Sequence, residues 1–109
     1  MDTEFIVQLC DPDRLAARDA IQLARQVSRV EQDLALNLGA FVGHLSQSAE
    51  IDRRALRRAL ELLYAVSGET SFVRICKRLS RNQNPVLRSL FRWLSYETPR
   101  RVRRAYASG

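Results

Sequence analysis

The chain has 109 residues and a formal net charge of +6, and 46% of its residues are hydrophobic. This length matches one domain of about 100 to 150 residues and excludes a two-domain enzyme, so we expect a single domain over residues 1–109. The two cysteines, Cys10 and Cys76, and an acidic N-terminus without a leader-like apolar run predict a soluble cytoplasmic protein with reduced thiols and no membrane partner.

The charge is distributed unevenly along the chain. Residues 1–50 carry four arginines and eight acids, for a net charge of −4, whereas residues 51–109 carry fourteen basic residues and four acids, for +10. The basic half predicts a polyanion partner, and the acidic half predicts contacts with other subunits of a homo- or hetero-oligomer. Seventeen of the eighteen basic residues are arginine. Guanidinium binds phosphate bidentately, but GC-rich coding is an alternative explanation of the excess.

Helices are predicted along the whole chain, beginning with a short one over about residues 3–9. Asp11-Pro12 then marks the start of a long helix, because proline fits the first helical position and aspartate accepts an N–H there. No Gly or Pro occurs from Asp13 to Leu38, and Gly39 ends this helix or notches it. The predicted apolar stripe, with spacings of three, four or seven, comprises Ala17, Ile21, Ala24, Val27, Leu34 and Leu38.

The second half of the chain contains signals for several more helices. Ser48 is placed to cap a helix that ends at Ser67-Gly68, and Thr70 begins the next one. Asn84-Pro85 and Thr98-Pro99 mark two further starts. No segment alternates apolar and polar residues, and no Asn-Gly or Asp-Gly turn occurs, so strands are not expected. We predict an all-α bundle of about five to six helices.

No group of residues predicts catalysis or a cofactor. His44 is the only histidine, and no spacing relates it to either cysteine, so we expect a surface histidine near a helix end rather than a metal ligand. Asp11 and Asp13 are explained by helix capping. Because the sequence also has no phosphate-binding loop and no nucleophile motif, we predict a protein that is not an enzyme, with no catalytic residue, no metal and no cofactor.

The basic residues are the positive signal for function. Four arginines in residues 53–58 occupy two adjacent rows of one helix, on the side away from Ile51, Ala55 and Ala59. Residues 74–104 add ten basic residues against Glu97 alone. Such a density of charge is tolerated more readily when phosphates neutralise it, although pairing with the acidic half is the alternative. The predicted phosphate-binding residues are Arg53, Arg54, Arg57, Arg58, Lys77, Arg78, Arg81, Arg88, Arg92, Arg100, Arg101, Arg103 and Arg104.

Three aromatic residues, Trp93, Tyr96 and Tyr106, alternate with these arginines. Exposed aromatic rings stack on nucleobases, and this would favour single strands or RNA. The alternative is packing within the protein. For Trp93, which neighbours Leu90 and Leu94, we expect a place in the core.

One local resemblance is carried by Ile75-Cys76-x-x-Leu79-Ser80 followed by Asn82-Gln83-Asn84-Pro85-Val86-x-x-Ser89-Leu90. This segment resembles a helix-turn-helix of the kind found in GntR-type regulators, in which Val86 would close the angle between the helices. The resemblance implies that Asn82, Gln83, Asn84 and Arg88 face base edges in the major groove. It departs from that pattern in having Arg81 where the turn usually carries an apolar residue.

A second resemblance extends over most of the chain. Residues 34–45, 52–60, 87–93 and 101–104 are similar, in order, to the successive helices of the small subunit of type I CRISPR surveillance (Cascade) complexes. The run Leu87-Arg88-x-Leu90-x-Arg92-Trp93, followed by the basic Arg101-Val102-Arg103-Arg104, carries most of this resemblance. It implies an all-helical, non-catalytic subunit that holds crRNA-paired target or displaced DNA through basic faces.

Together these features favour a scaffold subunit of a CRISPR ribonucleoprotein that binds nucleic acid without reading its sequence. A dimeric helix-turn-helix regulator of transcription is one alternative. A helical adaptor or inhibitor that binds only protein is the other.

Overall fold

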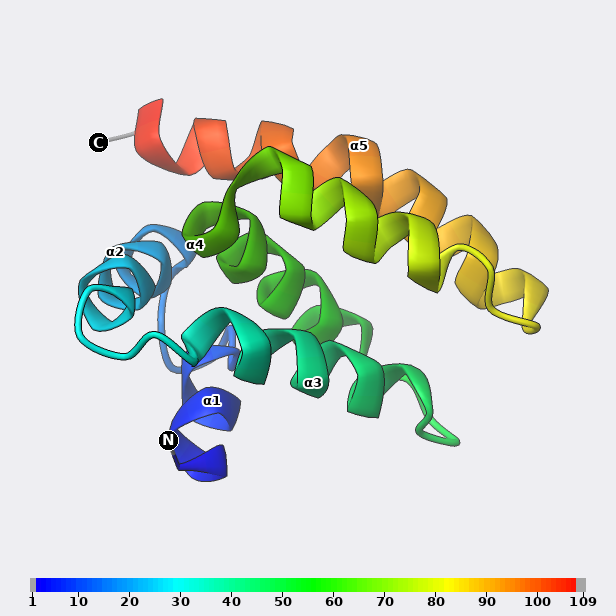
Figure 1. Ribbon diagram of the computed structural model, residues 1–109, viewed down its shortest axis with the longest axis horizontal. Helices are drawn as coiled ribbons and strands as arrows, with labels where there is room; N and C mark the ends of the chain where they lie inside the picture. Colours follow the sequence, from blue (N-terminus) through cyan, green and yellow to red (C-terminus); the bar gives the residue numbers. More distant parts are fainter. Residues whose placement is uncertain (1, 108–109) are drawn as a thin grey trace.

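The fold consists of helices alone (Figure 1). The computed structural model describes the backbone of residues 2–107 and the side chains of residues 2–105. The helices are α1 (Thr3–Leu9), α2 (Ala17–Ser28), α3 (Leu34–Ser46), α4 (Arg53–Leu79) and α5 (Pro85–Ala107). Within the described range no residue forms a strand, so the predicted all-α class is confirmed.

The predicted short helix at residues 3–9 is α1, and Asp2 caps it by accepting a hydrogen bond from the backbone N–H of Glu4. The prediction that Asp11-Pro12 begins the next helix is wrong. Asp11 instead organises a turn, because its carboxylate accepts from the backbone N–H of Asp13 at 2.9 Å and its carbonyl accepts from Leu15 at 3.3 Å. Helix α2 therefore begins only at Ala17.

The long helix predicted from Asp13 to Leu38 is two helices, α2 and α3, separated by residues 29–33. A continuous helix would place the charged Glu31 in the apolar stripe, between Val27 and Leu34. The break instead leaves Glu31 and Val30 in solvent, Val30 with 81% of its surface exposed. Gly39 lies inside α3 and does not end it.

Helix α4 begins later than predicted and is broken where predicted. Asp52, not Ser48, is its cap: the Asp52 carboxylate accepts from the backbone N–H of Ala55 at 3.0 Å, whereas the Ser48 hydroxyl donates to the carbonyl of His44. Gly68 has a φ of 83°, a conformation that favours glycine, and it divides α4 into residues 53–67 and 69–79. The chain reverses there, and the two segments run in opposite directions in Figure 1.

Helix α5 begins at Pro85, as predicted, and Asn84 caps it by accepting from the backbone N–H of Val86 at 3.0 Å. Thr98-Pro99 does not begin a further helix, because Pro99 lies inside α5. Leu94, Thr98 and Val102 form a row at four-residue spacing, and each is at most 3% exposed. Burial of this row favours one continuous helix in spite of the backbone hydrogen bond that proline cannot donate.

The hydrophobic core forms around the first segment of α4, against which α2, α3 and α5 pack. Its largest fully buried side chains include Phe72, Phe91 and Ile21. Cys10 and Cys76 are free thiols within it, and burial raises the pKa of each to about 12. Within the described residues no helix combines the length and the apolar character needed to cross a bilayer.

Candidate nucleic-acid interface

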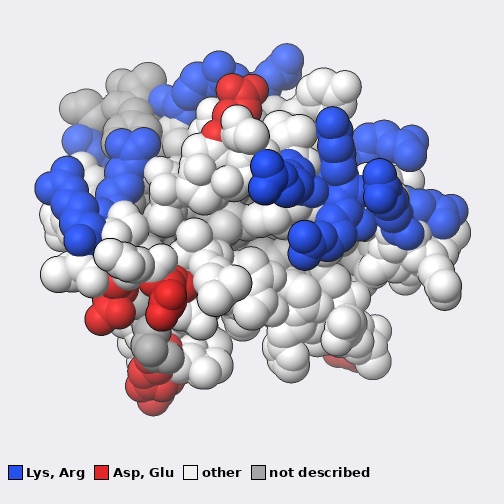
Figure 2. Space-filling model, viewed as in Figure 1, with Lys and Arg blue, Asp and Glu red and all other residues white. Residues whose placement is uncertain are grey.

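Figure 2 shows basic side chains in two groups on this face of the molecule, and the group on the left lies close to acidic side chains. Basic side chains gather over the second segment of α4 and the beginning of α5, and several acidic side chains lie near α1. The surroundings of the predicted phosphate-binding residues differ, however. Four contact carboxylates, one contacts only backbone carbonyls, and eight form no ion pair within the described part of the chain. The four are Arg54, Arg58, Arg101 and Arg104, the one is Arg88, and the eight are Arg53, Arg57, Lys77, Arg78, Arg81, Arg92, Arg100 and Arg103.

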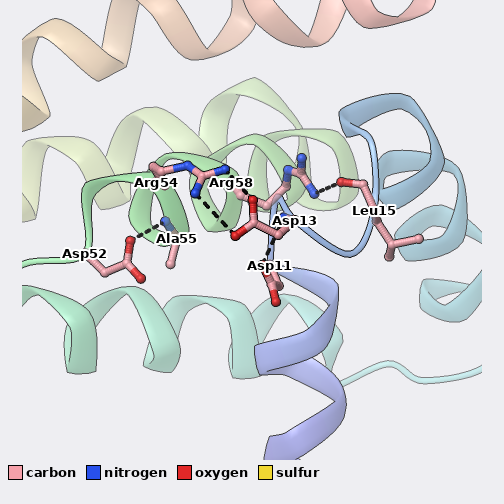
Figure 3. Close-up of polar contacts among 7 residues, drawn as sticks. All are labelled: Asp11, Asp13, Leu15, Asp52, Arg54, Ala55 and Arg58. Atoms are coloured by element: carbon pink, nitrogen blue, oxygen red, sulfur yellow. Dashed lines mark hydrogen bonds and ion pairs between the residues drawn. The ribbon is translucent and has the colours of Figure 1, made fainter.

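Arg54 is held by the turn before α2 (Figure 3). Its guanidinium donates to both carboxylate oxygens of Asp13, at 2.8 and 3.4 Å. This hydrogen bond, reinforced by the positive charge, lowers the pKa of Asp13 below its ordinary value. Both side chains are more than 60% exposed, at 64% and 73%, so solvent screens the pair. In the described residues this is the single ion pair between a predicted phosphate-binding residue and an acid of the first half.

The expectation that Arg58 lies on the exposed cationic face of the helix is wrong. The residue is 6% exposed, and its guanidinium donates to the carbonyl of Leu15 at 2.9 Å (Figure 3) and approaches Glu61 at 3.8 Å. Burial raises the pKa of Glu61, an effect that Arg58 and Arg101 partly oppose. The turn at residues 11–15 covers this row of α4, a long-range contact that helical spacing alone does not reveal.

Arg101 and Arg104 are directed to carboxylates of their own half of the chain. Glu97 lies 3.7 Å from Arg101 and 3.2 Å from Arg104, and Arg101 also lies 3.8 Å from Glu61. Arg101 is the less available of the two, because its side chain is 32% exposed against 70% for Arg104. The contact between Arg101 and Glu61 connects α5 to the first segment of α4.

The turn that resembled a helix-turn-helix uses its polar groups locally. Arg88 donates to the carbonyls of Asn82 and Gln83, at 3.2 and 3.4 Å, while Asn82 accepts from the backbone N–H of Asn84. Val86, expected to close the angle between the helices, is 55% exposed. To contact base edges, Asn82 and Arg88 would have to break these hydrogen bonds, which stabilise the turn.

Trp93 is on the surface, so the expectation that it lies in the core is wrong. Its ring is 45% exposed and lies between two guanidinium groups, with the Cζ of Arg57 at 5.3 Å from the ring centroid and that of Arg101 at 5.9 Å. Both distances fall within the range of a cation–π interaction. Arg57 comes from α4, so sequence spacing could not have placed it beside Trp93.

The cations without ion pairs concentrate on the hairpin formed by the second segment of α4 and α5. On α5, Arg92, Tyr96, Arg100 and Arg103 follow one another at spacings of four, four and three, which places them on one helical face. All four are exposed, Tyr96 by 72%. We call Arg92, Arg100 and Arg103, together with Tyr96, the α5 strip.

Lys77 near the end of α4 and Arg81 in the turn that follows it are both exposed. Arg74 and Arg78 line a groove beside α3. Arg53 is exposed at the beginning of α4. The side chain of Tyr106, the remaining aromatic residue of the prediction, lies outside the described residues.

The residues that the structure describes contain no group of three or more His, Cys, Asp or Glu side chains placed to hold a metal ion. Scans against family models, curated proteins and solved structures found no match to this chain.

Proposed function

We propose that the protein is a non-catalytic subunit that binds the sugar-phosphate backbone of a nucleic acid through the α5 strip, together with the exposed Lys77 and Arg81. The observation that supports this most strongly is the α5 strip itself. Its three arginines are exposed on one helical face and have no carboxylate partner in the described chain.

The charge of the strip has an energetic cost in the isolated protein. Arg100 and Arg103 are neighbours on the helix surface, three residues apart, and their like charges repel each other and lower the stability of the helix slightly. Phosphate removes this repulsion and releases condensed counterions when it binds, so a polyanion gains more from these residues than the folded protein does. Guanidinium groups that already contact Glu61, Glu97 or Asp13 offer less, because phosphate must compete with the carboxylate.

The side chains around the strip suit a ligand that is read through its backbone. Arginine forks bind phosphate oxygens without distinguishing bases. Tyr96 lies between Arg92 and Arg100, where an exposed ring can stack on a base of any identity. The resemblance to the small subunit of CRISPR surveillance complexes leads us to place this activity in a ribonucleoprotein scaffold, with the acidic first half in contact with neighbouring protein subunits.

The test is binding of fluorescein-labelled nucleic acids to the whole protein, measured by fluorescence anisotropy from about 50 to 300 mM salt. The probes are a 20-nucleotide single strand, the same sequence as RNA, and 20-base-pair duplexes of two unrelated sequences. We expect binding that weakens steeply with salt and that differs less than about threefold between the two duplexes. Absence of binding to every probe at 50 mM salt would contradict the proposal, and a strong preference for one duplex would favour a regulator instead.

Trp93 supplies an independent signal, because it is the single tryptophan of the chain and lies on α5 three residues before Tyr96. Nucleic acid bound along the strip should change the intrinsic fluorescence of this half-exposed ring. A binding isotherm from Trp93 should therefore agree with the isotherm from anisotropy.

A further inference from the structure

A groove separate from the α5 strip runs between α3 and the second segment of α4. It has a volume of about 710 Å³, and its lining is predominantly apolar. Figure 2 shows this region as a band of uncharged surface with basic side chains along one edge. The lining residues that matter for the argument are Leu36, Gly39, Gly43, Arg74, Ile75 and Arg78.

The groove exposes apolar surface that the fold does not use. Leu36 is 74% exposed although it lies on the helix that also buries Leu34 and Leu38. Ile75 and Leu79, on the opposite wall, are only partly buried. Apolar surface gathered in one concave site, rather than scattered singly, is typical of a surface that binds a partner.

Two glycines occupy the α3 wall at positions 39 and 43, one helical turn apart. A Cβ atom added at either position would meet nothing within 4 Å, so the packing of this chain does not require glycine there. Neither glycine has a positive φ, so the backbone does not require it either. Glycine is unfavourable in a helix interior, and its effect here is to deepen the groove and to allow a second helix to approach α3 closely.

Charge identifies the kind of partner. Arg74 and Arg78 lie one turn apart along the α4 wall, and neither forms an ion pair with any described residue. The groove is parallel to two helices, and α3 has thirteen residues, which corresponds to a length of about 20 Å, or more than three helical turns. We infer that the groove binds an amphipathic helix of a partner protein, with an apolar stripe against Leu36 and Ile75 and acidic residues along the flank that faces Arg74 and Arg78.

The test uses three labelled 16-residue peptides and the whole protein. The first peptide has leucines at i, i+3, i+4 and i+7 spacing with glutamates on one flank, the second has lysines in place of the glutamates, and the third is a scrambled sequence of the first. We expect the first peptide to bind at least tenfold more tightly than either of the others. Equal binding of all three, or binding of none, would overturn the inference.

Variants locate the site. Gly39→Leu with Gly43→Leu fills the groove, and we expect a loss of at least tenfold in affinity for the acidic peptide, with Gly39→Ala and Gly43→Ala giving a smaller loss. Since an added Cβ meets open space, these variants should keep their helical circular dichroism and thermal unfolding. Arg74→Ala with Arg78→Ala should weaken binding of the acidic peptide about tenfold. The matched loss of two exposed arginines at the two ends of α2, Arg18→Ala with Arg29→Ala, should not.

Other occupants would be recognised by the same variants. A concentration-dependent dimer in sedimentation that Gly39→Leu abolishes would overturn the inference in favour of a second copy of this chain. Competition between the acidic peptide and a 20-nucleotide strand, lost on the same substitution, would overturn it in favour of nucleic acid. The α5 strip is on different residues, so failure of the peptide experiment would leave the proposed nucleic-acid activity to its own test.

Discussion

Two sets of arginines, both from the arginine-rich second half of the chain, have different surroundings in the structure. In the first set, Arg58 contacts Glu61 within α4 and Arg101 contacts it from α5, and Glu61 is only 6% exposed. In the second, Arg92 and Arg100 extend into solvent from α5 with no carboxylate near them in the described chain. The few acids of the second half therefore decide which arginines stabilise the fold and which remain available to a ligand. The density of arginine along the chain does not decide this.

The largest effect should follow from breaking the buried set. Arg58→Ala removes one of the two cations that lie 3.8 Å from Glu61 and leaves the Leu15 carbonyl without its donor. We expect the free energy of unfolding to fall by about 3 to 5 kcal/mol, measured by urea denaturation. A loss below about 1 kcal/mol would mean that the site is hydrated and that Arg58 is not structural.

The exposed set should show the opposite behaviour. Replacing Arg92, Arg100 and Arg103 together by glutamine should weaken binding of a 20-nucleotide strand about a hundredfold at 0.1 M salt, because about three phosphate contacts are lost. The free energy of unfolding should change by less than about 0.5 kcal/mol, since these side chains make no contact that supports the fold. Unchanged affinity would show that the α5 strip is not the site.

A smaller effect concerns the buried side of α5. Thr98 is fully buried, and its hydroxyl has no hydrogen-bond partner among the described residues. Thr98→Val keeps the shape and removes the unsatisfied group, so we expect the protein to gain about 1 kcal/mol in thermal unfolding. Thr98→Ser, which keeps the hydroxyl and removes a methyl group, should destabilise the protein; a stabilising serine would contradict this account.

The smallest effects are two pKa changes of opposite sign. Burial raises the pKa of Glu61 above its ordinary value, and the hydrogen bond from Arg54 lowers the pKa of Asp13 below its ordinary value. Ionised Glu61 therefore costs stability above its folded pKa, and this cost disappears as the pH falls through that pKa. Asp13 contributes stability above its unfolded pKa and loses it as the pH falls through the lower folded value.

Carboxyl titration by NMR measures both values. Arg54→Gln should return the pKa of Asp13 towards its ordinary value and leave that of Glu61 unchanged. A pKa of Asp13 that does not respond to this substitution would show that the ion pair is absent in solution.

The sequence was sufficient for the fold class and for several helix ends. Asn84-Pro85 and Gly68 act locally, through a side-chain cap and a backbone conformation, and both were predicted correctly. Thr98-Pro99 has the same local signal as Asn84-Pro85 but lies inside α5, because burial of Leu94 and Val102 on the same face favours a continuous helix. Local signals were reliable where tertiary packing did not oppose them.

The candidate site was predicted only in part, for a related reason. Spacing along the sequence did not predict the exposed face that Arg92 and Arg100 share on α5, because Pro99 was expected to begin a separate helix. It also failed for Arg58, which the turn at residues 11–15 covers, and for Trp93, which Arg57 of another helix approaches. Contacts between elements far apart in the sequence decide which arginines remain available, and no spacing along the chain encodes them.

The central claim is that the arginines of the α5 strip, which have no carboxylate partner in the described chain, bind phosphate, and that the paired Arg54 and Arg104 contribute little. Its most direct test is the slope of log affinity against log salt concentration for binding of a 20-nucleotide strand. The slope is compared between two variants that each lose two arginines. The first is Arg92→Gln with Arg100→Gln, both on α5, and the second is Arg54→Gln on α4 with Arg104→Gln on α5. The account predicts that the first variant reduces the slope by about 1.4, or about 0.7 for each lost phosphate contact, while the second leaves it within experimental error of the unmodified protein. Equal reductions in both variants would contradict it, because binding would then depend on total charge and not on which cations the fold leaves free.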